Sequence, residues 1–185
     1  MWSALRPTPM ARPRDAKGID EAALERLYVK LERPMYNVVY RWLWNASDAQ
    51  EVVQEAFLRV WRAREGVDVA TVEPLLYRTA LNLASNRRRS ARLWRWLGLD
   101  DANEEPADTL TSEDALARAQ RQARVRAAID ALPERLREVL VLAEYAELSY
   151  GEIAATLGIP AGTVGSRRNA ALARLSEALG PIEEA

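Results

Sequence analysis

The sequence contains no cysteine, no histidine and a single phenylalanine among its 185 residues. The absence of cysteine and histidine excludes disulfides, thiol nucleophiles and imidazole acid–base catalysis. It also excludes the usual zinc ligands, and we expect neither a metal nor a cofactor. No Gly-rich phosphate loop is present, so an enzyme is not expected. No apolar run reaches membrane-spanning length and no signal-peptide core opens the chain, which favours a cytoplasmic protein.

Helix-forming residues dominate the amino-acid composition. Ala, Leu, Arg and Glu are abundant, β-branched runs are scarce, and 49% of the residues are hydrophobic, which is enough for real cores. Apolar side chains recur at helical spacing, and Pro34 is expected to break a helix or to begin the next one. The helices expected before the last motif span about 20–32, 35–44, 48–64, 72–96, 113–131 and 133–145. The sequence therefore predicts an all-α protein.

Charge is unevenly distributed along the chain, although the net charge is only −1. Residues 1–19 begin with three arginines and no acid before Asp15, and we expect a disordered basic tail. Residues 98–112 are acidic, contain Gly and Pro and lack aromatics, which is typical of a flexible linker. This linker separates two predicted helical domains, residues 20–97 and 113–185.

The stretch LSYGEIAATLGIPAGTVGSRRNAALARL, residues 148–175, has the outline of a helix-turn-helix. Ser149 and Glu152 form a capping-box pattern, as Ser47 and Gln50 do earlier in the chain. Gly158 suits a left-handed turn. The buried stripe of the second helix is expected to be Val164, Ala171, Leu172 and Leu175. An ordinary helical hairpin with a solvated arginine pair is the alternative.

Three motifs in order resemble the extracytoplasmic-function sigma factors of bacterial RNA polymerase. SDAQEVVQEAFLRVWRA is similar to their region 2.2, PLLYRTALNLASNRRRSAR to regions 2.3 and 2.4, and DALPERLREVLVLAEYAELSYGEIAATLGIPAGTVGSR to region 4. The resemblance covers about residues 20–180. It implies a sigma region 2 domain, an acidic linker and a sigma region 4 domain that together bind core polymerase and direct promoter-specific initiation.

The resemblance implies a polymerase-binding face on the helix from 48 to 64, made of Asp48, Glu51, Gln54 and Glu55. The three acids recur at spacings of three and four and share one face. The charge pattern alone favours a solvated acidic surface, and the family resemblance reverses that preference.

Recognition and melting of the minus-10 element are implied for the helix from 72 to 96. Arg side chains neutralise phosphates and Asn side chains bond exposed base edges. The residues are Arg78, Asn82, Asn86, Arg87, Arg88, Arg89 and Arg92. The loop 66–71 resembles the family's pocket for a flipped base, although relatives commonly carry Asp where Asn86 stands. A basic surface that binds any polyanion is the alternative.

Recognition of the minus-35 element is implied for Thr163, Ser166, Arg167, Arg168 and Asn169. Relatives usually carry a basic residue at Gly165 and Arg at Ala170. Residues 120–185 hold eight arginines against nine acids, so this domain alone is expected to bind DNA weakly.

Two other functions fit parts of the pattern: a helix-turn-helix regulator acting without polymerase, and a sigma mimic that sequesters a regulator. The family resemblance also implies an anti-sigma factor as partner. The acidic linker is either a plain tether or an imitation of nucleic acid inside polymerase. The six tryptophans are expected to be mostly core or interface anchors.

Overall fold

The computed structural model describes residues 18–97 and 113–180, which contain seven α-helices and no strand. Residues 1–17 of the predicted basic tail (1–19), the predicted acidic linker (98–112) and residues 181–185 lie outside the described residues. The helices are α1 (Glu21–Leu43), α2 (Ala46–Arg62), α3 (Val72–Trp96), α4 (Glu113–Ala131), α5 (Glu134–Tyr145), α6 (Tyr150–Leu157) and α7 (Ala161–Leu179), with a 3₁₀ turn at Arg64–Gly66. The all-α prediction is confirmed.

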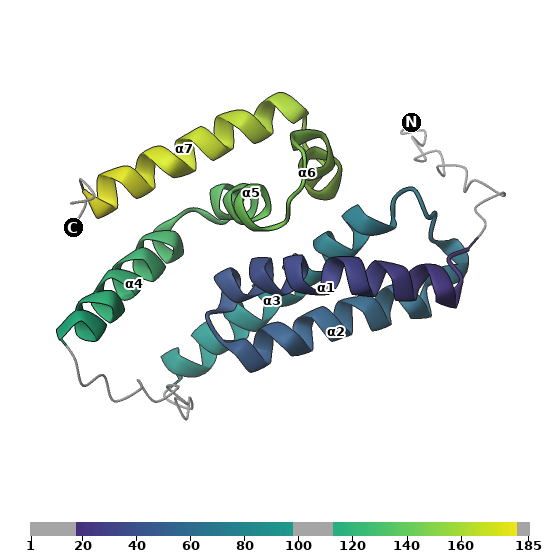
Figure 1. The fold of residues 1–185 in the computed structure, drawn as a ribbon, viewed down its shortest axis with the longest axis horizontal. Coiled ribbons are helices and arrows are strands. Elements are labelled where there is room, and N and C mark those ends of the chain that lie inside the picture. Colours follow the sequence, from purple (N-terminus) through teal and green to yellow (C-terminus); the bar gives the residue numbers. More distant parts are fainter. Residues whose placement is uncertain (1–17, 98–112, 181–185) are drawn as a thin grey trace, which may run out of the picture.

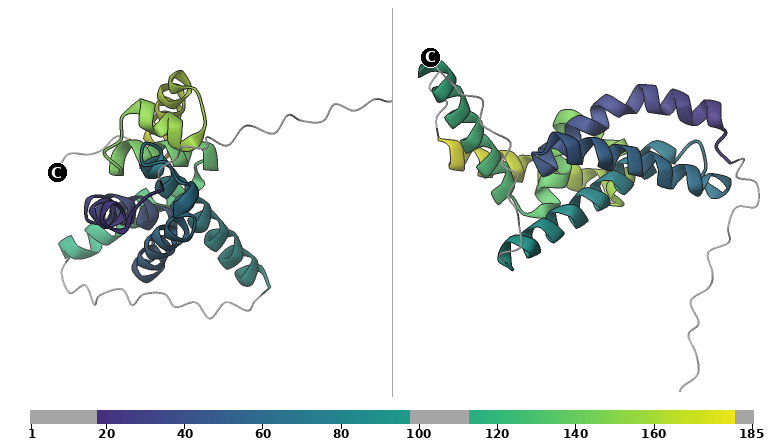
Figure 2. Two further views of the ribbon diagram at one scale, coloured as in Figure 1. Left: turned by 90° about the vertical axis from the view of Figure 1, so that its right-hand side faces the viewer. Right: turned by 90° about the horizontal axis from the view of Figure 1, so that it is seen from below.

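Helices α1, α2 and α3 form a three-helix bundle, here called the N-terminal unit (residues 18–97). Helices α4 to α7 form the C-terminal unit (residues 113–180), in which α5 packs on α6 and α7 (Figure 1). The C-terminal unit lies against one side of the bundle through α5 on α1 and α6 on α3, and the turned views agree (Figure 2).

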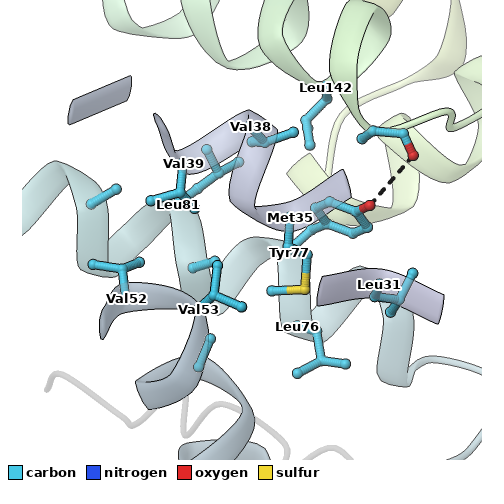
Figure 3. Packing of buried hydrophobic residues seen from close by; sticks show 14 of the residues in the cluster. Leu31, Met35, Val38, Val39, Val52, Val53, Leu76, Tyr77, Leu81 and Leu142 are labelled. Atoms are coloured by element: carbon cyan, nitrogen blue, oxygen red, sulfur yellow. Dashed lines mark hydrogen bonds between the residues drawn. The ribbon is translucent and has the colours of Figure 1, made fainter. Parts of the chain in front are cut away.

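One apolar core runs through both units. Met35, Val39 and Leu81 of the bundle are fully buried, and Leu142 of α5 is part of the same cluster (Figure 3). At its edge the hydroxyl of buried Tyr77 donates to the carbonyl of Ala146 over 3.3 Å. Burial raises the pKa of this hydroxyl, which therefore remains protonated and available as a donor. The sequence predicted two domains but not this shared core.

The predicted break at Pro34 is wrong. Helix α1 continues through Pro34, although proline removes one backbone hydrogen bond at a cost of about 3 kcal/mol. Leu31, Met35 and Val38 on either side are buried in the core, and this burial offsets the cost. A real break occurs later, where Trp44 adopts a left-handed conformation with φ 55°.

The predicted capping box at Ser47 is also wrong. After the turn at Trp44 the chain is extended at Asn45, whose side chain accepts from the Asp48 N–H at 2.8 Å and caps α2. Ser47 lies inside the first turn of α2. The left-handed residue sets the start of the helix two positions earlier than the sequence pattern indicated.

Three further details differ from prediction. Ile19, assigned to the disordered tail, is buried and donates its N–H to the Arg64 carbonyl. Leu172, assigned to the buried stripe of α7, is 37% exposed. Trp94 and Trp96, in the last turn of α3, are 52% and 81% exposed. Trp42, in contrast, is a core anchor.

Candidate functional site

The predicted polymerase-binding residues share the outer surface of α2, where apolar Val52, Val53 and Phe57 face the core and leave the polar side outside. Glu51 and Gln54 are exposed, and Asp48 and Glu55 are partly exposed. Glu55 accepts from Arg59 at 2.8 Å, one helical turn away. This hydrogen bond lowers the pKa of the Glu55 carboxyl. Glu55 is therefore ionised at neutral pH and paired with Arg59.

A groove beside this surface was not predicted from the sequence. It has a volume of about 630 Å³ and lies between α1 and α2. Gln54 is on its wall, and its lining is otherwise mostly apolar with two carboxylates from α1. The other lining residues are Glu21, Leu24, Glu25, Tyr28, Phe57, Leu58 and Trp61. Leu58, which is exposed, and Trp61, which is half-buried, give α2 a second apolar edge along this groove.

The predicted minus-10 residues lie along α3, but the structure divides them into two groups. Arg78, Asn82, Asn86, Arg89 and Arg92 are exposed and follow one another at steps of three or four. Arg87 and Arg88 are partly buried, because each turns toward another helix. The exposed group is a stripe of cationic and amide side chains that suits a single strand of DNA.

Arg87 belongs with the acidic surface of α2. Its guanidinium donates to Asp48 Oδ1 at 3.0 Å and to Glu51 Oε2 at 2.8 Å. One predicted DNA-contacting residue is therefore bound to two predicted polymerase-contacting residues.

Arg88 faces the other unit. Its guanidinium donates to Asp130 Oδ1 at 2.7 Å, at the end of α4, and to the backbone carbonyl of Trp42 at 3.3 Å. Ser85, one turn earlier, donates to Glu134 at 2.7 Å. This side of α3 is consequently covered by the C-terminal unit and is not open to DNA in this arrangement.

The loop 66–71 forms a compact turn before α3. Asp68 accepts from the Ala70 N–H at 2.9 Å, and its backbone carbonyl accepts from the Thr71 hydroxyl at 3.2 Å. Val67 is buried, whereas Val69 is 53% exposed. The exposed residues of the loop are Gly66, Asp68, Val69, Ala70 and Thr71, so its surface contains no aromatic side chain.

The helix-turn-helix is built as its sequence predicts. Ser149 and Glu152 form the complete capping box, with the Ser149 N–H donating to Glu152 at 2.8 Å. These hydrogen bonds lower the pKa of the Glu152 carboxyl. Gly158 ends α6 with φ 65°, and Pro160 precedes α7. Buried Val164 and Ala171 orient the recognition helix, so the prediction for these two residues is confirmed.

The predicted minus-35 residues occupy the first half of α7. Ser166 and Asn169 are exposed, whereas Thr163 and Arg167 are partly buried. The Ser166 hydroxyl donates to the Thr163 carbonyl at 3.1 Å, which leaves its oxygen free to accept.

Arg168 forms an ion pair with another residue of the chain. Its guanidinium bonds Glu144 of α5 at 2.7 Å and 2.9 Å, and this bond raises the pKa of Arg168. Glu138, also on α5, has its pKa raised by burial and by neighbouring Glu134, and only partly lowered by Arg167 and Arg78. The Arg168–Glu144 ion pair therefore makes the recognition surface less cationic than the two adjacent arginines suggest.

Within the described residues no group of three potential metal ligands is close enough to hold an ion. Over the same residues no helix is both long and apolar enough to cross a membrane.

Comparison with known families matches both units. The family described as "Sigma-70 region 2" matches residues 27–93, and "Sigma-70, region 4" matches residues 122–175. The chain is 35% identical over 157 residues to the "ECF RNA polymerase sigma factor SigE" of Mycolicibacterium smegmatis, covering 83% of this chain and 61% of that protein. It is 33% identical to the "RNA polymerase sigma-H factor" of Pseudomonas aeruginosa, covering 88% and 89%.

Two solved structures have a similar fold. CnrH, in complex with the cytosolic domain of CnrY, aligns with a TM-score of 0.64 at 25% identity over 86% of this chain and 89% of that one. The sigma factor RpoE of Bartonella quintana, in complex with the anti-sigma factor NepR, shares the fold with a TM-score of 0.61 at 18% identity, over 86% and 98%. With both sigma regions matched in order, the chain belongs to the extracytoplasmic-function sigma factors of the sigma-70 family, alternative sigma factors that direct transcription initiation.

Proposed function

We propose that this chain binds core RNA polymerase through the acidic surface of α2 and directs it to promoters read by α3 and α7. The observation that carries the proposal is the arrangement on the N-terminal unit. There an acidic face (Asp48, Glu51, Gln54 and Glu55) and an exposed Arg/Asn stripe lie on neighbouring helices of one bundle. A factor that positions polymerase on melted DNA needs both surfaces at once, one for protein and one for a separated strand.

The domain assignment follows from this function. Residues 20–97 act as sigma region 2 and contact the minus-10 element, and residues 113–185 act as sigma region 4 and contact the minus-35 element. Residues 98–112 connect them. Asn86 is part of the stripe, and its amide can bond an exposed base edge where relatives present a carboxylate.

The C-terminal unit contributes sequence reading more than affinity. With Arg168 paired to Glu144, few arginines at the start of α7 are free for phosphates. Attachment to polymerase raises the local concentration of promoter DNA, which compensates for weak intrinsic binding. The low charge also limits non-specific binding by the free protein.

The remaining partners and properties are proposed on the same basis. The chain catalyses no covalent change. An anti-sigma factor is an expected partner, since a sigma factor of the same fold is known in complex with one. Because bacterial transcription takes place in the cytoplasm, we expect the protein to work there.

The proposal is tested by transcription in vitro with core polymerase on a genomic promoter library. Specific initiation that depends on added chain supports it. Sequence-specific DNA binding without initiation would instead indicate a regulator that acts alone. A chain that neither binds DNA nor starts transcription, yet binds a regulatory protein, would be a sigma mimic.

A further inference from the structure

A cavity lined by arginine and aromatic side chains lies where the end of α1 meets α4 and α5. Its volume of about 390 Å³ is within the range of roughly 300–1,000 Å³ that small-molecule pockets occupy. None of its lining residues belongs to the proposed polymerase or promoter surfaces. It is called the Arg41 cavity below, and its lining residues are Tyr40, Arg41, Trp44, Arg121, Gln122, Val125, Arg126 and Tyr145.

The lining of the Arg41 cavity contains three arginines and no carboxylate. The chain as a whole balances 26 basic residues against 27 acidic ones. The groove between α1 and α2 and the cavity beside the loop 66–71 both have carboxylates in their walls. Three like charges around one small space repel one another, and a bound anion would relieve that repulsion.

Aromatic rings hold Arg41 in place without using its hydrogen-bond donors. Its guanidinium carbon lies 4.9 Å from the ring centre of Tyr145, and 5.3 Å and 5.5 Å from those of Tyr40 and Trp44. Such contacts use the flat face of the guanidinium and leave the N–H groups at its edges free to donate. Within the part of the chain that the structure describes, no acceptor bonds the Arg41 guanidinium.

The other two arginines come from α4. Arg126 donates to the Tyr40 hydroxyl at 3.3 Å and lies 5.3 Å from the ring centre of Trp44. Arg121 is exposed, and it has no ion-pair partner among the residues that the structure describes. The two units of the protein therefore both supply guanidiniums to this cavity.

We propose that the Arg41 cavity binds a nucleoside oligophosphate. Guanidinium groups match phosphate oxygens in charge and in geometry, so the three arginines hold the phosphates. The rings of Tyr40, Trp44 and Tyr145 give the same cavity an aromatic wall for a planar base. This site goes beyond the proposed sigma function and does not depend on it.

Isothermal titration calorimetry on the full chain tests the proposal, with ADP, GDP, inorganic pyrophosphate and adenosine as the probes. We expect a Kd on the order of 10 µM for ADP and GDP. Pyrophosphate lacks the base and adenosine lacks the phosphates, so each should bind about tenfold more weakly or worse. The Kd for ADP should rise with ionic strength, because the phosphate contacts are between charges.

Variants locate the binding. Arg121→Ala should raise the Kd for ADP about fivefold to tenfold, and Arg121→Lys should keep it within about threefold of the unmodified chain. Arg135→Ala is the control and should leave the Kd unchanged, because it removes an exposed arginine at the start of α5, whereas Tyr145 is at the end of that helix. Circular dichroism checks that each variant keeps its helices.

The proposal is overturned if neither ADP nor GDP binds, or if Arg121→Ala binds ADP as tightly as the unmodified chain does. Pyrophosphate binding as tightly as ADP would overturn the assignment of a nucleoside and leave a site for phosphate alone. A short single-stranded oligonucleotide is the last probe. If it binds more tightly than ADP and also loses affinity in Arg121→Ala, the cavity belongs to a DNA-binding surface and the proposal fails.

Discussion

Arg87 donates to Glu51 across 2.8 Å and thereby joins α3 to α2. The same guanidinium bonds Asp48, so one arginine holds two carboxylates of the proposed polymerase surface. Arg87 is therefore better assigned to orienting that surface than to contacting DNA. The two proposed functions of the N-terminal unit are physically connected at this residue.

The first prediction concerns this arginine. Arg87→Ala should raise the Kd for core polymerase about threefold to fivefold, because Asp48 and Glu51 lose their fixed orientation. Arg89→Ala, at an exposed neighbouring position, serves as the control and should leave that Kd unchanged. The measurement is a fluorescence titration of polymerase without DNA. Equal values for Arg87→Ala and the unmodified chain would contradict the assignment.

The capping box at α6 predicts a pH dependence. The pKa of Glu152 is lowered in the folded state by its hydrogen bonds to Ser149, so its contribution is present above the unfolded pKa and is lost as the pH falls through the folded pKa. Glu152→Ala should reduce the free energy of unfolding by about 1 kcal/mol at pH 7 and by much less in acid below the lowered pKa. Urea denaturation at several pH values measures this. Glu177→Ala is the control, and a difference that stays constant with pH would be inconsistent with the cap.

The shared core predicts unequal costs for two leucines. Leu142 is fully buried between the units, whereas Leu172 is 37% exposed on α7. Leu142→Ala should lower the free energy of unfolding by about 2–5 kcal/mol. Leu172→Ala should cost about 1 kcal/mol or less. Tryptophan fluorescence during urea unfolding measures the free energy of unfolding of both variants. Comparable losses of stability in the two variants would argue against a core that continues into the C-terminal unit.

Base reading by α7 is tested at Asn169. This side chain is exposed on the recognition helix, where its amide can reach a base edge. Asn169→Ala should reduce the preference of the holoenzyme for its minus-35 element over a scrambled one by about tenfold, with the salt dependence of binding unchanged. Arg174→Ala, further along the helix, should not alter that preference. Competition binding with the minus-35 element and the scrambled sequence measures this preference. If the ratio of the two affinities is unaltered in Asn169→Ala, Asn169 makes no base contact.

Local features of the fold were predictable from sequence because they depend on neighbouring residues. The helix at 113–131 and the Ser149–Glu152 cap match the structure. Pro34 failed as a boundary because burial in a core assembled from distant segments outweighs a local rule. Periodicity identifies an apolar face but not the element that covers it, so the packing of Leu142 into the bundle could not be anticipated.

The candidate site shows the same division between local features, which the sequence predicts, and tertiary contacts, which it does not. The exposed Arg/Asn stripe follows from helical spacing and was found in the sequence. The partners of Arg87 and Arg88 were not, since Glu51 and Asp130 are 36 and 42 positions away along the chain. Ion pairs at such separations depend on tertiary packing, and within the described residues Arg87 and Arg88 have such partners in the protein.

Binding of the purified chain to core RNA polymerase, followed by run-off transcription, tests the central claim most directly. A sigma factor should form a stable complex and start transcripts at defined sites, and Glu51→Lys, which reverses one charge on the α2 surface, should weaken that complex. If the chain shows no association with core polymerase in the absence of any inhibitor, the proposed function is contradicted.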